Sequence, residues 1–382
     1  IRCLMKKIII IIIIIFIIDF IIVKILKNFE IWSSIEVKKN YWRISSDIYH
    51  HDILPNLNVD ESWGRSNYKL ITNSLGFRDY ANNKIYKRSS KKRLILIGDS
   101  FVEGIGLSYE NSLSGKITKF LDNEFEVLNM GVASYSPTNY YYKLKYFIES
   151  GYNISSVFVF LDLSDIVDEI KYNYKNNNQL ILESHSIKSK KLFFFNYLNN
   201  NFIVFKFISK FSEYFGKLKK KIKNRYIEDG IGASKIFKKN FFNVTKQDRN
   251  LYYMIYKQPS IWTFNDKNLR YNFDNTKKGL ERSKMNLDRL FKLLNENNIK
   301  SKLIIYPHPA QIYMEDNFYQ DYWYKFSKKN NIEFVNTFPA FKIKNSNKKL
   351  FILENFIEGD IHWNEKGSKI IFDFLKKNRH LN

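Results

Sequence analysis

Short, uninterrupted apolar segments alternate with helical patterns along much of this 382-residue chain. Continuous apolar runs are typical of strands that helices cover on both faces. Alternation of such strands with helices therefore predicts an α/β fold with a parallel sheet between two helical layers. The predicted strands are residues 93–98, 126–131, 156–162, 302–307 and 332–336. The predicted helices are residues 113–121, 137–150, 279–297, 316–329 and 365–377.

Five parts are predicted from these patterns. Residues 1–30 are predicted to hold a membrane anchor, and residues 31–90 an irregular, polar and aromatic lead-in. The sheet domain is predicted in two pieces, 91–170 and 276–382. Between them, residues 171–275 are too many for one crossover connection and several windows are helical in pattern. This stretch is predicted to be a mostly helical, basic insertion, with its densest basic run at residues 217–223.

The net charge is large, because 62 Lys and Arg residues stand against 38 Asp and Glu residues, giving +24. A polyanion such as nucleic acid, acidic glycan or anionic lipid is one interpretation. A general over-use of Lys, Asn and Ile, as an AT-rich genome produces, is the favoured one, since the lysines are spread along most of the chain. No nucleic-acid-binding motif is present, so no nucleic acid partner is expected. One cysteine, Cys3, excludes an internal disulfide framework and a cysteine-based zinc cluster.

An apolar run extends from Ile8 to Leu26, broken by Asp19 and Lys24 and preceded by Lys6 and Lys7. Its length approaches that of a transmembrane helix when Lys24 reaches toward the headgroups. No small-residue cleavage site follows it, which favours an uncleaved signal anchor over a cleaved signal peptide. The expected location is the bacterial inner (cytoplasmic) membrane, crossed once, with the remaining chain on the periplasmic or extracytoplasmic side.

Residues suited to nucleophilic catalysis follow the first predicted strand and precede the last predicted helix. Ser100 lies beyond the carboxyl end of a strand, where ligands bind in parallel α/β sheets. A serine hydroxyl needs a general base and donors for the developing oxyanion. Asp360 and His362 stand two residues apart, so in extended backbone both project to one side. Asp360 can then bind Nδ1 of His362 and leave Nε2 facing Ser100, as a catalytic triad requires.

Three blocks in this order resemble the SGNH/GDSL hydrolase family, which comprises serine esterases and acyltransferases. The blocks are Gly98-Asp99-Ser100, Asn129-Met130-Gly131 and Asp360-Ile361-His362. The resemblance implies a flavodoxin-like, three-layer sheet, the triad Ser100, His362 and Asp360, and no cofactor. The more usual spacing of acid and histidine would place the acid at Gly359, which leaves Glu358 as a minor rival to Asp360.

The resemblance also implies an oxyanion hole built from the N–H groups of Ser100 and Gly131. The family's third block, Gly-x-Asn-Asp, departs in this chain, where Ser164 stands at the position of the asparagine donor. Three alternatives remain: Ser164 substitutes as a donor, another group does, or the enzyme is slow. Loss of one oxyanion donor can cost about 10²–10³ in rate.

Other polar residues near the predicted site have two interpretations each. Asp99, His308 and Asp165 are candidate pocket residues, although His308 could instead shape a rigid loop. Ser100 taken alone could cap the helix that follows it. Arg78 is expected to be a structural ion-pair partner, with an anion clamp as the alternative. No metal site is predicted, because the remaining histidines lack ligand spacing: His50, His51, His185 and His380.

The expected function is a membrane-anchored serine ester hydrolase that removes acetyl groups from cell-envelope glycans. A polysaccharide O-acetyltransferase with the same triad is one alternative, and it would need a membrane partner as acyl donor. A non-catalytic glycan-binding or assembly protein on the same fold is the other, favoured only by Ser164. The expected partners are an acylated glycan or another ester, and the membrane through Ile8–Leu26.

Overall fold

The computed structural model describes residues 7, 16–25, 42–63, 66–175, 179–182, 202, 250–251, 254–255, 273–315, 317–342 and 347–381. Residues 42–183 and 245–382 form one compact unit, and residues 1–41 and 184–244 form another. The first of these units carries the sheet and the residues of the candidate site.

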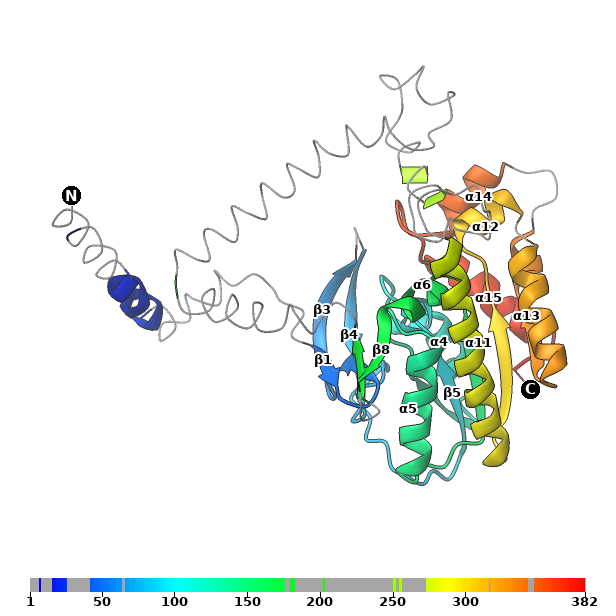
Figure 1. Cartoon of the computed structure of the whole chain (residues 1–382), viewed down its shortest axis with the longest axis horizontal. Coiled ribbons are helices and arrows are strands. Elements are labelled where there is room, and N and C mark those ends of the chain that lie inside the picture. The colour runs from blue at the N-terminus through cyan, green and yellow to red at the C-terminus, as the bar shows by residue number, and fades with distance from the viewer. Residues whose placement is uncertain are drawn as a thin grey trace, which may run out of the picture. The chain divides into compact units, whose positions relative to one another are not determined.

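A five-stranded parallel sheet is the centre of this unit (Figure 1). Its strand order is β11-β10-β7-β5-β6, which in chain order is 2-1-3-4-5, the flavodoxin-like arrangement. The predicted parallel α/β sheet is therefore confirmed, and each strand lies within two residues of its predicted start. The strands are β5 (Lys92–Ile97), β6 (Phe125–Asn129), β7 (Ser156–Leu161), β10 (Lys300–Ile305) and β11 (Glu333–Asn336).

The helices between and after these strands confirm the predicted alternation. The helices at 113–121 and 365–377 begin and end at the predicted residues. The α-helices of this unit are α3 (Ser100–Glu103), α4 (Leu113–Leu121), α5 (Pro137–Glu149), α6 (Leu163–Lys171), α11 (Phe273–Glu296), α12 (Pro309–Met314), α13 (Phe318–Lys329), α14 (Lys348–Asn355) and α15 (Glu365–Lys377). Among the described residues of this unit there are also two 3₁₀ turns, η1 (Tyr109–Asn111) and η5 (Phe338–Phe341).

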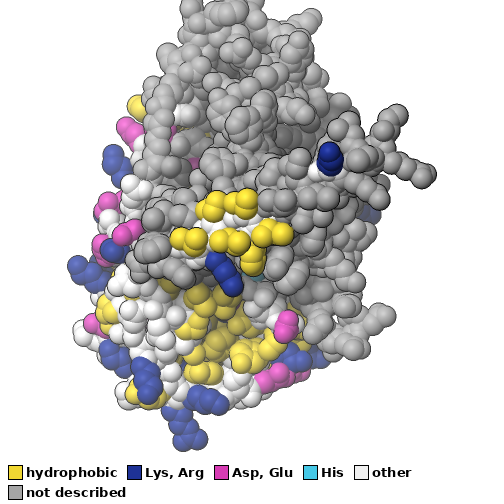
Figure 2. Space-filling model, turned by 90° about the vertical axis from the view of Figure 1, so that its left-hand side faces the viewer, with side chains coloured by type: hydrophobic (Ala, Val, Ile, Leu, Met, Phe, Trp, Pro, Cys, Tyr) yellow, Lys and Arg dark blue, Asp and Glu magenta, His cyan; other side chains and the backbone are white. Residues whose placement is uncertain are grey.

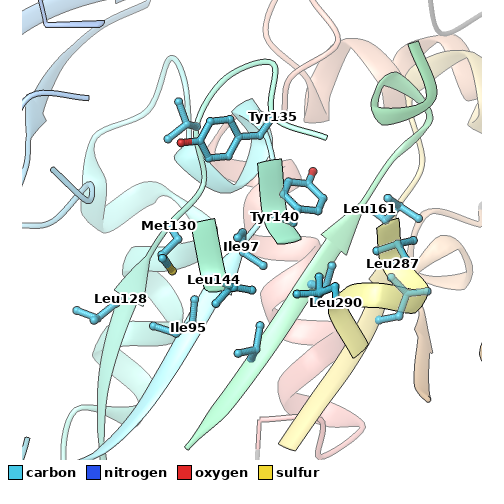
Figure 3. Close-up of a cluster of buried hydrophobic side chains, with 14 of the residues drawn as sticks. Ile95, Ile97, Leu128, Met130, Tyr135, Tyr140, Leu144, Leu161, Leu287 and Leu290 are labelled. Atoms are coloured by element: carbon cyan, nitrogen blue, oxygen red, sulfur yellow. The ribbon is translucent and has the colours of Figure 1, made fainter. Parts of the chain in front are cut away.

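The sheet is buried on both faces because successive strand residues point into two different hydrophobic clusters. Ile95 and Ile97 pack with α5 and α11, as Figure 3 shows with Leu144 and Leu290. Leu94 and Leu96 belong to the opposite cluster, which holds residues of α4 and α15, while α13 contributes to the first. This two-sided burial explains the continuous apolar strands and produces the three layers.

Side-chain caps fix where several helices begin. Ser112 accepts a hydrogen bond from the N–H of Gly115 at the start of α4, and Asn364 accepts from two N–H groups at the start of α15. Asp99 caps α3 by accepting from the N–H of Phe101. Ser100 is thus the first residue of α3, and Asp99 holds the capping position considered for Ser100.

The predicted irregular lead-in instead contains two antiparallel hairpins. Their strands are β1 (Arg43–Ser46), β2 (His50–Ile53), β3 (Asn58–Trp63) and β4 (Ser66–Ile71). Buried polar contacts join them to the sheet domain: Lys143 Nζ lies 2.9 Å from Asp52 Oδ1, and Tyr135 donates to the carbonyl of His51 at 2.6 Å. These hairpins were missed because each strand is short and carries polar residues.

Little of the predicted insertion is among the described residues. Its beginning forms a third hairpin, β8 (Tyr172–Lys175) and β9 (Gln179–Leu182). The predicted helical content of the rest, and the basic run at 217–223, lie outside the described residues.

The other unit includes a described helical segment at 16–25, within the predicted membrane anchor. The described residues include no helix that is both long and apolar enough to span a membrane. Phe16 and Phe20 contact the ring of Phe202. On the described part of the face in Figure 2, Lys and Arg side chains lie at several places along the left and lower edges, some of them beside Asp and Glu.

Candidate active site

The candidate site lies at the carboxyl edge of the sheet, between the strands where its order reverses. Ser100 follows β5 after a two-residue connection, and β5 pairs with β6 on one side and β7 on the other. This crevice is where ligands bind in doubly wound sheets. His362 reaches it from the loop between α14 and α15, 262 residues away in the chain.

Ser100, His362 and Asp360 form one hydrogen-bonded chain. Ser100 Oγ lies 2.7 Å from His362 Nε2, and His362 Nδ1 bonds to Asp360 Oδ1. The backbone N–H of His362 also donates to Asp360 Oδ1, at 3.0 Å. Asp360 and His362 thus meet through an Asx turn rather than the extended backbone that was expected, and Gly359 enters the turn with a φ of +76°. The structure brings the three predicted residues together.

Glu358, the rival acid, points elsewhere. Its carboxylate accepts a hydrogen bond from Asn250 Nδ2, at 2.5 Å. Asp360, not Glu358, therefore contacts the imidazole.

The pairing with Asp360 stabilises the protonated, positively charged form of the His362 imidazole, relative to a free imidazole in water. Burial opposes the charge on His362, but the hydrogen bond to Asp360 and its negative charge outweigh burial and raise the pKa of His362 above 6.5. Burial likewise disfavours the Asp360 carboxylate, yet the same contacts lower its pKa below 3.8. Asp360 is therefore the anionic partner, and His362 is a stronger base than a free imidazole.

Trp63, at the end of β3, contacts both Asp360 and His362. The sequence did not indicate this contact. Its Nε1–H donates to Asp360 Oδ2 at 3.1 Å, and its ring meets the imidazole of His362 edge-on, at 5.5 Å between centroids and 87° between planes. The available hairpin signal was weak: Val59 and Trp63 are apolar positions of one strand face before Gly64, but Glu61 stands between them.

A second acceptor stands beside the nucleophile. Ser100 Oγ lies 3.2 Å from Asp99 Oδ2 and closer, at 2.7 Å, to His362 Nε2. Asp99 is buried and also accepts from Tyr306, at 3.0 Å. Burial and the nearby charge of Asp162 raise the pKa of Asp99 to about 8. A single hydroxyl proton serves one acceptor at a time, and the shorter distance favours His362.

The other candidate pocket residues lie behind the nucleophile in a buried polar network. His308 Nε2 lies 2.9 Å from Asp162 Oδ2, and its side chain is fully buried. Asp165 accepts from Tyr140 at 2.7 Å and from the N–H of Asp162 at 2.8 Å. None of the predicted set Asp99, His308 and Asp165 is among the residues that line the cavity at Ser100. His308 thus fits the rigid-loop alternative.

Two of the three predicted oxyanion donors are engaged elsewhere. The N–H of Gly131 donates to Asn129 Oδ1 at 3.0 Å. The hydroxyl of Ser164 lies 2.6 Å from Asp162 Oδ1 and 3.3 Å from Asp99 Oδ2. Ser100 is the first residue of α3, a position whose N–H has no partner within its own helix. In this state the N–H of Ser100 is the predicted donor best placed for an oxyanion.

Arg78 supports the turn after the nucleophile rather than offering a free positive charge. It is buried and donates to the carbonyls of Glu103, at 2.7 Å, and of Gly104 and Leu107. Gly104 ends α3 with a φ of +80°, where a side chain would be strained. The structural interpretation of Arg78 therefore fits these contacts, although its partners are carbonyls rather than an acidic side chain.

A cavity of about 10 Å³ opens beside Ser100 and His362. Apolar side chains line most of it: Phe101, Ile105, Leu107, Leu113 and Trp363. Such a volume holds about one water-sized group. The cavity therefore matches a small apolar substituent.

Comparisons with known proteins give structural matches alone. No family model and no curated protein matches the chain. A protein from Desulfitobacterium hafniense, described as lipolytic and of the G-D-S-L family, is 11% identical with a TM-score of 0.37, covering 75% of this chain and 99% of its own. LAE5, an alpha/beta hydrolase from the metagenome of Lake Arreo, is 11% identical with a TM-score of 0.36, covering 78% and 99%. A lipolytic G-D-S-L family member from Veillonella parvula is 10% identical with a TM-score of 0.32, covering 75% and 97%. In its Gly-Asp-Ser block, its strand order and the arrangement of Ser100, His362 and Asp360, this chain resembles the SGNH/GDSL hydrolases.

Proposed function

We propose that this protein is a serine ester hydrolase in which Ser100 is the nucleophile. The observation that carries the proposal is the 2.7 Å contact of Ser100 Oγ with His362 Nε2, while Asp360 binds the other ring nitrogen. Each role of a catalytic triad is then filled by one residue.

The reaction has two halves. Ser100 Oγ attacks the ester carbonyl, its proton passes to His362 Nε2, and that proton then goes to the departing alcohol as its C–O bond breaks. Water next attacks the acyl-serine and gives its proton to His362. His362 then returns that proton to Ser100 Oγ as the acyl C–Oγ bond breaks and the acid is released. Asp360 holds the imidazole in the tautomer with its Nδ1–H toward the carboxylate and stabilises the imidazolium. The N–H of Ser100 faces the oxyanion, and Gly131 or Ser164 joins it only by giving up its present acceptor.

An acetyl ester is the proposed substrate class. The cavity at Ser100 holds a group about the size of one water molecule, and its lining is largely apolar. The acetyl group is proposed to be carried by a cell-envelope glycan, with the apolar run at residues 8–26 as a membrane anchor and the catalytic unit on the extracytoplasmic side.

The test is release of acetate from an O-acetylated polysaccharide by the full chain, compared with its Ser100→Ala variant. Acetate release that depends on Ser100 is expected, together with faster hydrolysis of 4-nitrophenyl acetate than of the octanoate ester. Transfer of acetyl to an added glycan in place of acetate release would identify the acyltransferase. Equal activity of Ser100→Ala would overturn the proposal.

A non-catalytic glycan-binding protein is the second candidate, favoured by the engagement of Gly131 and Ser164 with internal acceptors. A fluorophosphonate that labels Ser100 in the full chain would exclude it, since only an activated serine reacts with this reagent. Absence of labelling, with glycan binding retained, would favour it.

A further inference from the structure

We infer that Trp63 is a positioning residue of the active site, supplied by the hairpin β3–β4. The inference rests on the proposed function, because it assigns Trp63 a role through Asp360. Its basis is that the one indole joins two members of the triad: Nε1–H binds Asp360 at 3.1 Å and the ring packs edge-on against His362.

The hydrogen bond fixes the rotation of the Asp360 carboxylate. Oδ1 accepts from the ring and backbone nitrogens of His362, and Oδ2 accepts from Trp63. With both oxygens engaged, the carboxylate plane is held so that Oδ1 faces the imidazole. Without the indole N–H, only the contacts of Oδ1 to His362 limit rotation of the carboxylate about its C–C bond, and Oδ2 then needs a donor from solvent.

The contact between the Trp63 ring and the imidazole restrains His362, the second triad residue that Trp63 touches. The indole stands edge-on beside the imidazole on one side, and Phe101 packs on it from another, at 4.8 Å between centroids. The imidazole therefore contacts two aromatic side chains, which limit its rotation away from Ser100 Oγ.

The end of β4 that pairs with Trp63 lies beside the loop that follows the nucleophile. A Cβ added to Gly106, in the loop after α3, would fall 3.7 Å from Cβ of Ser66, an ordinary contact distance. Ser66 pairs with Trp63 in the hairpin register. The strand end that carries Trp63 is therefore close to the Ser100 side of the site as well as to Asp360.

The test compares Trp63→Phe with Trp323→Phe in the full chain, using 4-nitrophenyl acetate. Trp323 is a matched control, because its ring is buried on α13 and its Nε1 has no hydrogen-bond partner in the part of the chain that the structure describes. Trp63→Phe is expected to lower kcat about tenfold or more with KM nearly unchanged, since hydrogen bonds to charged groups are of that order. Trp323→Phe should leave both constants unchanged.

Three further results separate positioning from general support. Removing the indole N–H in an Asp360→Asn background should change kcat less than about twofold, because the two residues act as one unit. The downfield proton resonance of the His362 Nδ1–H should move in Trp63→Phe and stay in Trp323→Phe. Trp63→His, which retains a ring N–H, should recover part of the activity.

Circular dichroism first establishes that Trp63→Phe is folded. Additive losses of kcat in the Trp63→Phe/Asp360→Asn double variant, or an unmoved His362 Nδ1–H resonance in Trp63→Phe, would then overturn the inference. Should Trp63→Phe fail to fold, the comparison passes to Trp63→Leu, which also lacks the indole N–H; an unmoved resonance and an unchanged kcat relative to the wild-type chain again reject the inference. Failure of the proposed function has a different signature, since the wild-type chain itself would then hydrolyse no ester and would not label at Ser100.

Discussion

Arg43 and Glu103, 60 residues apart, form a two-bond ion pair that ties the first hairpin to the helix carrying Ser100. The guanidinium nitrogens lie 2.7 and 2.5 Å from the two carboxylate oxygens. The Glu103 side chain is fully buried and also accepts from the N–H of Ala133, at 2.7 Å. Burial disfavours its charge, but Arg43 outweighs burial and lowers the pKa of Glu103. The nucleophile's helix is thus anchored by a residue from outside the sheet.

Replacing Arg43 by Met should lower the free energy of unfolding by about 3–5 kcal/mol, because a buried carboxylate is left without its cation. Urea denaturation followed by circular dichroism measures the change. The control is Lys369→Met, which breaks an exposed pair with Asp373 on α15 and should cost less than about 1 kcal/mol. Equal effects of the two substitutions would contradict a special role for the buried pair.

The pH dependence of kcat/KM should follow His362. The general base must be neutral, so activity falls as pH drops through the pKa of His362. This pKa is raised, and the midpoint of the acidic limb should therefore lie above 6.5. In Asp360→Asn the hydrogen bond and the charge of Asp360, the two largest influences that raise the pKa of His362, are lost, while burial and the smaller effects of Asp99 and Asp162 remain, so the midpoint should fall. A midpoint that does not respond to this substitution would remove His362 from the role of base.

The choice of acid can be tested with one chemical change at two positions. Asp360→Asn should lower kcat by about 10⁴, the order found when a triad aspartate is replaced by its amide. Glu358→Gln makes the same change two residues away on a side chain directed at Asn250, and it should leave kcat unchanged. Steady-state hydrolysis of 4-nitrophenyl acetate gives both values. The reverse ranking would make Glu358 the orienting acid.

Ser164 is expected to matter little as an oxyanion donor, because its hydroxyl binds Asp162. Ser164→Ala should therefore lower kcat by far less than the about 10²-fold cost of losing one donor. Ser164→Asn, which introduces the longer amide donor of the related family, should raise kcat. The measurement is kcat of the wild-type chain, Ser164→Ala and Ser164→Asn at saturating ester. A loss of about 10²-fold in Ser164→Ala would instead place the Ser164 hydroxyl in the oxyanion hole.

The sheet could be predicted because its strands are continuous apolar runs that two helical layers cover. The same logic placed Ser100 at the carboxyl edge of the sheet, where ligands bind. His362 was assigned to Ser100 from its spacing to Asp360 and from the family resemblance. Asp360 was identified correctly as the partner of His362 in space, although a turn and not a strand joins them. In each case the signal is local, within a few residues of the feature it predicts.

The hairpins and Trp63 were missed because their stabilising contacts are long-range. Trp63 and Asp360 are 297 residues apart, and nothing near Trp63 indicates which carboxylate it meets. The engaged state of Gly131 was equally hidden, since it depends on the rotamer of the Asn129 side chain. Family blocks give residue types at positions, whereas the direction of an N–H depends on the packed structure.

The hairpins at residues 42–71 also change what counts as the smallest working enzyme. A fragment beginning at residue 91 would hold the entire sheet and all three triad residues, and by sequence blocks alone it would look complete. It would nevertheless lack the cation of the buried Glu103 carboxylate and the donor to Oδ2 of the half-buried Asp360. Such a fragment should fold poorly or turn over slowly, so the catalytic unit begins at or before Trp42, well ahead of its first catalytic motif.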